Sequence, residues 1–211
     1  MPLSLTSPNN FSNLNMQDLA DTFNLQHFQL AFSELGLLEN QDKLIQKIVK
    51  NSSQKIMYWN EQELIMKHIA FILDIVDFSG DNFDAFAERN LSGFVEGVEF
   101  VGIMDFVVAR GEYEPREPYF FIQEYKRFKM GENSDPQAQV LAEMLVAQVL
   151  NNEKTVYGCY IIGKFWYFVI LEDKKYTISK ELDSTNLEEL TEIIGKLNWV
   201  KSYVEEKLSK K

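Results

Sequence analysis

Residues 97–126 read GVEFVGIMDFVVARGEYEPREPYFFIQEYK, two apolar runs joined by a polar segment that contains two prolines. The first run is apolar at both alternation phases around Asp105, which is typical of a β-strand buried on both faces. In the second run, residues 119–126, side chains alternate between the two faces of a strand, so Glu124 and Lys126 point the same way. The stretch therefore predicts the centre of a β-sheet that carries charged groups in its interior.

These charged groups need a reason to be buried. An ionised carboxylate without a partner costs several kcal/mol to bury, so Asp105 must be neutralised, paired or bound to a cation. If the two runs pair with each other, Asp105, Glu124 and Lys126 converge on one patch of the sheet. Two carboxylates can hold a divalent metal ion, and an ammonium group would lie beside them.

Length and composition favour one domain with a sheet. The chain has 211 residues, which suits one sizeable core, and we divide it into an N-terminal helical extension (residues 1–56) and a main domain (residues 57–211). Aromatic residues make up 13% of the chain, which favours strands. The predicted class is α/β, an α+β mixed sheet flanked by helices.

Charge and cysteine content limit the classes of binding partner and the cellular compartment. The formal net charge of −11 counts against a general nucleic-acid coat protein, because an acidic surface repels phosphate backbones unless the contact face is locally basic. The single cysteine, Cys159, is predicted to be a small core residue, and its isolation suits a reducing cytoplasm. Residues 1–10 do not resemble a signal peptide, and no stretch approaches the roughly 18 apolar residues that span a bilayer. We expect a cytoplasmic protein without membrane contact.

The N-terminal half is expected to be mainly helical. Residues 1–14 are expected to lack order at their start, and residues 16–49 follow a helical pattern with Leu25, Phe28, Phe32 and Leu35 on one face. A further helix is expected to begin at Asn60, which forms a capping-box pattern with Glu63, and to run to residue 78. Residues 77–90 read as a loop, and a short strand over residues 91–95 is expected before a tight turn.

The C-terminal half alternates helix and strand. Asp135 and Pro136 signal the start of a helix over residues 137–150, with Leu141, Leu145 and Val149 on its core stripe and Gln139 displaced from it. Strands are expected over residues 155–162, 165–171 and 175–179, followed by an amphipathic helix over residues 187–208.

Two residues of the first long helix have two interpretations each. Glu61 lies in line with the apolar stripe, where it either stabilises the helix dipole from the first turn or adds a carboxylate to the site. His68, on the same helix, is expected to be a hydrogen-bonded core residue rather than a ligand.

The order of elements resembles the core of the PD-(D/E)xK, or restriction-endonuclease-like, nuclease superfamily, and the chain looks like a bacterial subgroup of it. In that family the second strand supplies an Asp and the third a Glu or Asp two residues before a Lys. Gly102-Ile103-Met104-Asp105 matches the first motif and Gln123-Glu124-Tyr125-Lys126 the second, over a resemblance that covers residues 59–171. Met104 stands where the family name has proline. Gln139 matches the glutamine of the following helix, and Glu61 matches an acidic residue of the first helix.

The resemblance implies a metal-dependent nuclease, a hydrolase of phosphodiester bonds. Asp105, Glu124 and Lys126 would be its catalytic residues, assisted by Gln139 and Glu61. Asp105, Glu124 and the Tyr125 carbonyl would bind Mg²⁺ or Mn²⁺. The expected partner is nucleic acid, DNA before RNA, with a homodimer as a further expectation because many nucleases of this type dimerise. Arg110, Arg116, Arg127 and Lys129 either guide the nucleic-acid backbone or are solvated loop charges.

Two alternatives remain beside the nuclease. The charged trio could be an ion network in a non-catalytic domain of the same fold that binds nucleic acid or a protein, which the acidic composition favours. A small-molecule hydrolase would need a nucleophile with a neighbouring base, and the sequence shows no such pair.

Overall fold

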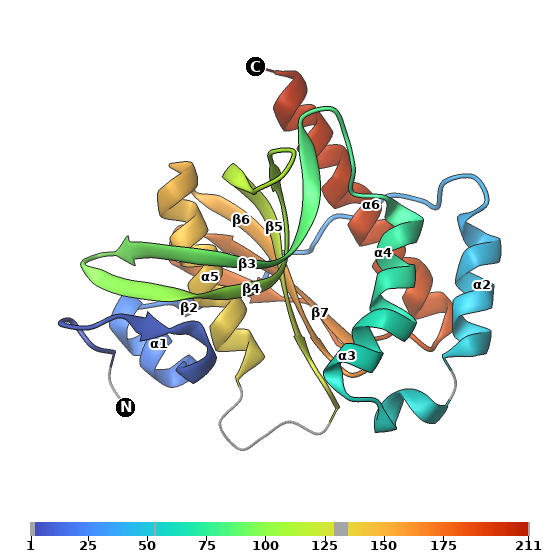
Figure 1. Cartoon of the computed structure of the whole chain (residues 1–211), viewed down its shortest axis with the longest axis horizontal. Coiled ribbons are helices and arrows are strands. Elements are labelled where there is room, and N and C mark those ends of the chain that lie inside the picture. Colours follow the sequence, from blue (N-terminus) through green and yellow to red (C-terminus); the bar gives the residue numbers. More distant parts are fainter. Residues whose placement is uncertain (1–2, 53, 129–134, 211) are drawn as a thin grey trace.

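The chain forms a mixed sheet with helices on both faces (Figure 1). The computed structural model describes residues 3–52, 54–128 and 135–210. In these residues nine strands form one sheet, with a main order of β1-β4-β5-β6-β7-β8-β2, while β3 pairs with β4 and β9 pairs with β7. The predicted α/β class with a mixed sheet is confirmed.

The strands are β1 (Asn9–Asn10), β2 (Gln26–His27), β3 (Phe83–Val95), β4 (Val98–Arg110), β5 (Arg116–Lys126), β6 (Thr155–Ile162), β7 (Phe165–Glu172), β8 (Lys175–Ile178) and β9 (Leu182–Asp183). The helices are η1 (Phe11–Asn13), α1 (Met16–Phe23), α2 (Gln41–Asn51), η2 (Gln54–Tyr58), α3 (Glu61–Leu64), η3 (Ile65–Ile69), α4 (Ala70–Val76), α5 (Pro136–Asn151) and α6 (Leu187–Ser209). Strands β3, β4 and β5 are antiparallel neighbours, whereas β5 and β6 are parallel and are connected through α5. Parallel strands need such a crossover, which here places α5 against the centre of the sheet.

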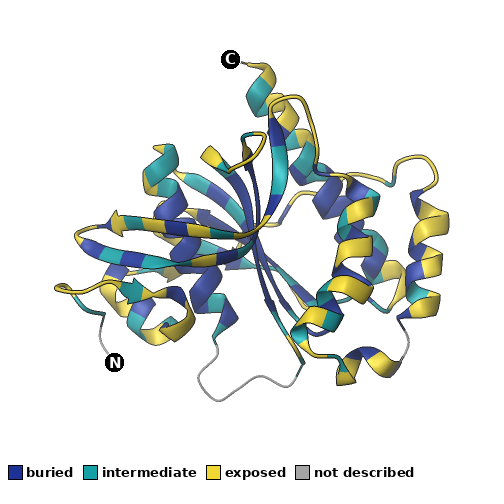
Figure 2. Cartoon of the chain, viewed as in Figure 1, coloured by how far each residue is buried: buried dark blue, intermediate teal, exposed yellow. Residues whose placement is uncertain are grey.

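Two cores lie on opposite faces of the sheet (Figure 2). Helices α2, α3, α4 and α6 cover one face, where they pack on residues such as Phe121, Trp166 and Phe168. Helix α5 covers the other face together with η1 and α1. Helix α5 is therefore buried around most of its circumference from Pro136 to Ala147, whereas Val149, predicted to face the core, is exposed.

The N-terminal segment differs from the predicted helical pattern. Residues 9–13 form β1 and η1, and β1 pairs in parallel with β4. Residues 1–2, the start of the segment that was expected to lack order, lie outside the described residues. Helix α1 ends at Asn24, which adopts a left-handed conformation, and β2 then pairs with β8. The apolar spacing of residues 25–35 predicted a helix, but Gln26 and His27 pair with β8 and no helix forms there. Phe28 and Leu35 are exposed, while Phe32 is buried. The segment thus contributes strands at both ends of the main strand order.

The helix predicted from Asn60 is present with an irregular middle. Asn60 accepts a hydrogen bond from the Glu63 N–H and Glu63 closes the predicted capping box. Helices α3 and α4 are joined by the π-helical turn η3, and the run ends at Asp77 in a left-handed conformation. His68 is buried, with its Nδ1 2.7 Å from the Ser52 hydroxyl and its Nε2 2.7 Å from the Ser184 hydroxyl. The predicted core role of His68 is confirmed.

The hairpin of β3 and β4 is longer than predicted. The predicted loop over residues 77–90 is mostly strand, because β3 begins at Phe83, while the turn at Glu96 and Gly97 is present. β4 is buried on both faces only in its second half: Ile103 is 56% exposed, contrary to the sequence pattern. The reason is that β4 pairs with β5 only from Phe106 onward, while its first half extends beyond β5.

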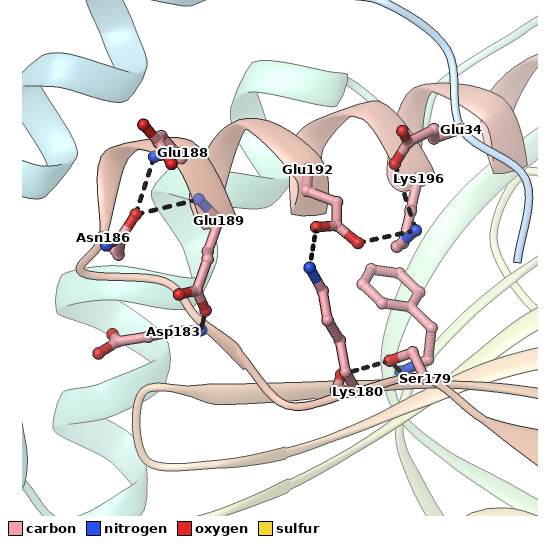
Figure 3. A network of polar contacts seen from close by, with 10 residues as sticks. Glu34, Ser179, Lys180, Asp183, Asn186, Glu188, Glu189, Glu192 and Lys196 are labelled. Atoms are coloured by element: carbon pink, nitrogen blue, oxygen red, sulfur yellow. Dashed lines mark hydrogen bonds and ion pairs between the residues drawn. The ribbon is translucent and has the colours of Figure 1, made fainter.

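Helix α6 is tied to the sheet by polar contacts (Figure 3). Asn186 caps its first turn by accepting from the Glu188 and Glu189 N–H groups. Further along, the Lys180, Glu192, Lys196 and Glu34 side chains form a chain of ion pairs, with Lys196 buried between two carboxylates. None of the described helices is both long and apolar enough to cross a membrane.

Candidate functional site

The site begins where strand β4 separates from β5. The paired register of the two strands runs from Arg110 opposite Arg116 to Phe106 opposite Gln123. One residue further, the Tyr125 N–H donates to Oδ2 of Asp105 at 2.7 Å, so a side chain takes the place of a backbone acceptor. The pairing of β3 with β4 also skips a residue here: Glu88, with a positive φ of 51°, lies between the pairs Ala87–Phe106 and Arg89–Met104. The register is the same on both sides of this break, so Glu88 lies opposite Asp105.

The second half of the site is the end of β5. The Lys126 ammonium forms an ion pair with Oε1 of Glu124 and also donates to the Tyr125 carbonyl at 3.1 Å. Glu124 is 1% exposed, whereas the Lys126 side chain is partly exposed. The Tyr125 N–H thus donates to Asp105, and the Tyr125 carbonyl accepts from Lys126. The backbone of Tyr125 therefore connects Asp105 to the pair of Glu124 and Lys126. The predicted convergence of Asp105, Glu124 and Lys126 is therefore present.

Burial shapes the protonation of the two carboxyl groups. Burial, and then the nearby Asp105 charge, raises the pKa of Glu124 to about 8, against the opposing effect of Lys126. Burial also raises the pKa of Asp105, although the Tyr125 N–H and Lys126 counteract it. Burial alone would lower the pKa of Lys126, but the carboxylates of Glu124 and Asp105 raise it.

Glu61 lies at the margin of this site. It is half-buried at the start of α3, and burial raises its pKa, while the charges of Lys126 and Arg127 lower it and that of Asp105 raises it. Within the described residues no hydrogen bond or ion pair joins it to the trio. Glu61 therefore lies near Lys126 and Asp105, and its role as a helix-dipole acid or as a site carboxylate stays a prediction.

Gln139 is buried in the first half of α5. In the described part of the chain, no hydrogen bond connects its amide to Asp105, Glu124 or Lys126. It lies four residues before Glu143, on the same face of the helix.

Glu143 is the charged residue of this region that the sequence pattern did not single out. It is 0% exposed, and neither of its carboxylate oxygens has a hydrogen-bond partner among the described residues. Burial raises its pKa well above the usual range, and the charges of Glu124 and Asp105 add to the effect while Lys126 opposes it. The signal that could have found it is its i+4 spacing from Gln139, which places both on one helical face.

Asp105, Glu124 and the Tyr125 carbonyl are the groups of this site that could hold a metal ion. The part of the chain that the structure describes contains no group of three or more His, Cys, Asp or Glu side chains arranged to hold a metal ion. Mg²⁺, however, commonly uses one or two carboxylates and retains several waters. Asp105, Glu124 and the Tyr125 carbonyl offer such a set, and Oε2 of Glu124 is buried without a hydrogen-bond donor. A cation would supply the positive charge that this oxygen lacks.

The predicted local cations do not gather at the trio. Arg127 is the nearest in sequence and is exposed, and its charge lowers the pKa of Glu61. Arg110 and Arg116 face each other at the opposite end of the β4–β5 pairing. Lys129 lies outside the described residues.

Comparison with known proteins does not define a family. No family model matches the chain, and no curated protein matches it. A solved structure described as the crystal structure of SSO0001 is 13% identical, with a TM-score of 0.30, over 84% of this chain and 81% of the other.

Proposed function

We propose that this chain is a metal-dependent phosphodiesterase of the PD-(D/E)xK type that hydrolyses nucleic acid, with DNA as the expected substrate. The observation that carries the proposal is the junction of β4 and β5. There Asp105, which lies just beyond the last backbone pair of β4 and β5, is beside the pair of Glu124 and Lys126. Buried acidic and basic groups of perturbed pKa at one point of a sheet are a common feature of functional sites.

Each residue has a role in this reaction. Asp105 and Glu124, with the Tyr125 carbonyl, would hold Mg²⁺ or Mn²⁺, which when bound lowers the pKa of water and polarises the phosphate. Lys126 would orient the attacking water and offset the negative charge that develops on the phosphate in the transition state. Glu61 and Gln139 would line the margins of the site.

A second candidate is a non-catalytic domain of the same fold that binds nucleic acid or a protein. It is favoured by the low exposure of Glu124 and by its ion pair with Lys126, which leave the ammonium already partnered. The net charge of −11 points in the same direction. Metal binding separates the two candidates, because an ion network without a catalytic role needs no cation.

The test is calorimetric titration of Mn²⁺ and Mg²⁺ into the wild-type protein and into Asp105→Asn. Nicking of supercoiled plasmid and cleavage of single-stranded DNA are measured on the same preparations. Asparagine keeps an oxygen that can accept the Tyr125 N–H, so the fold should be retained. The exposed Asp81 is the matched control, as Asp81→Asn.

We expect Asp105→Asn to lose metal binding together with cleavage, by at least about 100-fold, while Asp81→Asn retains both. If the wild-type protein binds neither ion at millimolar concentration, the catalytic proposal is wrong and the binding-domain candidate takes its place.

A further inference from the structure

Glu143 is a buried carboxyl group that the fold alone does not explain. It lies in the middle of α5, is completely buried, and neither of its oxygens receives a hydrogen bond within the described residues. A buried acceptor without a partner costs about 1–3 kcal/mol, and more when it is charged. Leucine at this position would avoid that cost, so a carboxyl group here calls for a ligand.

The surroundings of Glu143 show which ligand would suit it. Glu124 follows Ile122 by two residues on β5, and Asp105 precedes Val107 by two on β4, so both carboxyl groups lie on the face of the sheet that α5 covers. The charges that act on Glu143 are those of Glu124, Asp105 and Lys126, in agreement with this placement. There, three carboxyl groups share one ammonium, and the ion pair of that ammonium is with Glu124. Oε2 of Glu124 also lacks a hydrogen-bond donor. The unsatisfied oxygens of Glu143 and Glu124 thus belong to one electron-rich region with too little positive charge.

Direct coordination by all three carboxylates is not the arrangement that the structure offers. No three acidic, histidine or cysteine side chains in the described residues are placed to hold one metal ion. Mg²⁺ keeps several of its waters when it binds protein, and these waters need acceptors. Residues that hold the outer shell of a metal in this way change its affinity by 10–100-fold when they are mutated.

We propose that Glu143 is a positioning residue for the cation of this site: it accepts hydrogen bonds from metal-bound water on the α5 side of Asp105 and Glu124. This inference rests on the proposed function and adds a third carboxylate to its site. It also explains why Glu143 lacks partners within the chain, because its partner would be hydrated Mg²⁺.

The experiment compares Glu143→Gln and Glu143→Asp with the wild type and with Asp105→Asn. Affinity for Mg²⁺ and Mn²⁺ is measured by calorimetry, and thermal unfolding is recorded with EDTA and with each ion. Glu205→Gln is the control, because Glu205 is exposed on α6. None of these measurements depends on cleavage of a substrate.

We expect Glu143→Gln to bind the ions 10–100-fold more weakly than the wild type, with an unchanged or higher unfolding temperature in EDTA and a smaller gain on adding metal. Glu143→Asp should recover part of the affinity, and Glu205→Gln should match the wild type. Wild-type affinity in Glu143→Gln, with none in Asp105→Asn, would overturn this inference and leave the proposed function intact. Unfolding of both Glu143 variants in EDTA would also overturn it, since Glu143 would then serve the core. A wild type that binds no metal would overturn the proposed function itself.

Discussion

At the scale of single residues, the site depends on one side chain that takes the place of a backbone hydrogen-bond acceptor. Asp105 accepts the Tyr125 N–H where β4 and β5 cease to pair, and this hydrogen bond fixes its carboxylate. The same geometry keeps it close to Glu124, and burial of both groups raises the pKa of each. The cost of this arrangement should be visible in the pH dependence of folding.

We expect the free energy of unfolding, measured in EDTA, to fall as the pH rises from 6.5 to 8. Glu124 has a pKa of about 8 in the folded chain, against an ordinary value of 4.5, so the folded state holds a proton that the unfolded state has released. The stabilisation from this group is complete below its ordinary pKa and is lost as the pH rises through the folded value, with a slope of at most about 1.4 kcal/mol per pH unit. Urea unfolding of the wild type and Glu124→Gln provides the measurement.

The variant should show the shallower slope, and parallel profiles would contradict the assignment to Glu124. The pH range begins at 6.5 because, below this pH, His68 makes the free energy of unfolding change in the opposite direction. Burial lowers the pKa of His68 to about 4, so its contribution is lost on acidification.

At the scale of elements, the start of α3 sets the position of Glu61. The capping box of Asn60 and Glu63 fixes the first helical residue, and that residue is Glu61. Its sequence signal is local, since both partners lie within four residues, and this explains why the sequence predicts the start of the helix correctly. The π-helical turn that follows, Ile65–Ile69, has no comparable signal, because the buried hydrogen bonds of His68 to Ser52 and Ser184 involve distant residues.

Removing the cap should weaken this element. Asn60→Ala loses the acceptor for the Glu63 N–H and is expected to lower the free energy of unfolding by about 1 kcal/mol. Chemical denaturation is the measurement, with the exposed Gln62→Ala in the same turn as the control, expected to stay within about 0.5 kcal/mol. Equal effects of the two substitutions would mean that the cap contributes nothing specific to stability.

At the scale of the whole molecule, the N-terminal segment completes the core around α5. Phe11 is 1% exposed and stacks on Phe100 of β4, with ring centroids 6.1 Å apart. Gly102 permits this approach, because a Cβ at that position would lie 2.4 Å from the Phe11 ring. The segment that covers the sheet therefore also supports the strand that carries Asp105.

Phe11→Ala should destabilise the folded chain strongly. The substitution leaves a cavity between η1 and β4, and truncation of a buried Phe costs about 3–5 kcal/mol. Denaturation by urea would measure this loss, with Leu5→Ala as the control because Leu5 is 75% exposed. A loss below about 1 kcal/mol would show that residues 3–13 are not part of the folded core.

The sequence by itself determined the features that depend on neighbouring residues. Strand alternation placed Glu124 and Lys126 on one face, the cap of Asn60 and the turn at Glu96 and Gly97 were readable, and the mixed class followed from them. It also predicted the meeting of Asp105 with this pair, given that the two runs are neighbours in the sheet.

Only the tertiary structure decided the features that depend on contacts between distant segments. The pairing of β2 with β8 replaced part of a predicted helical pattern, and β1 pairs with β4 where no strand was predicted. The cover of η1 and α1 buried both sides of α5. Periodicity reports which side of a helix is apolar, but it does not report that a second layer covers the other side. For this reason the sequence left Glu143 as one acid among many, and the fold placed it near Asp105 and Glu124, with no hydrogen-bond partner for its carboxyl oxygens among the described residues.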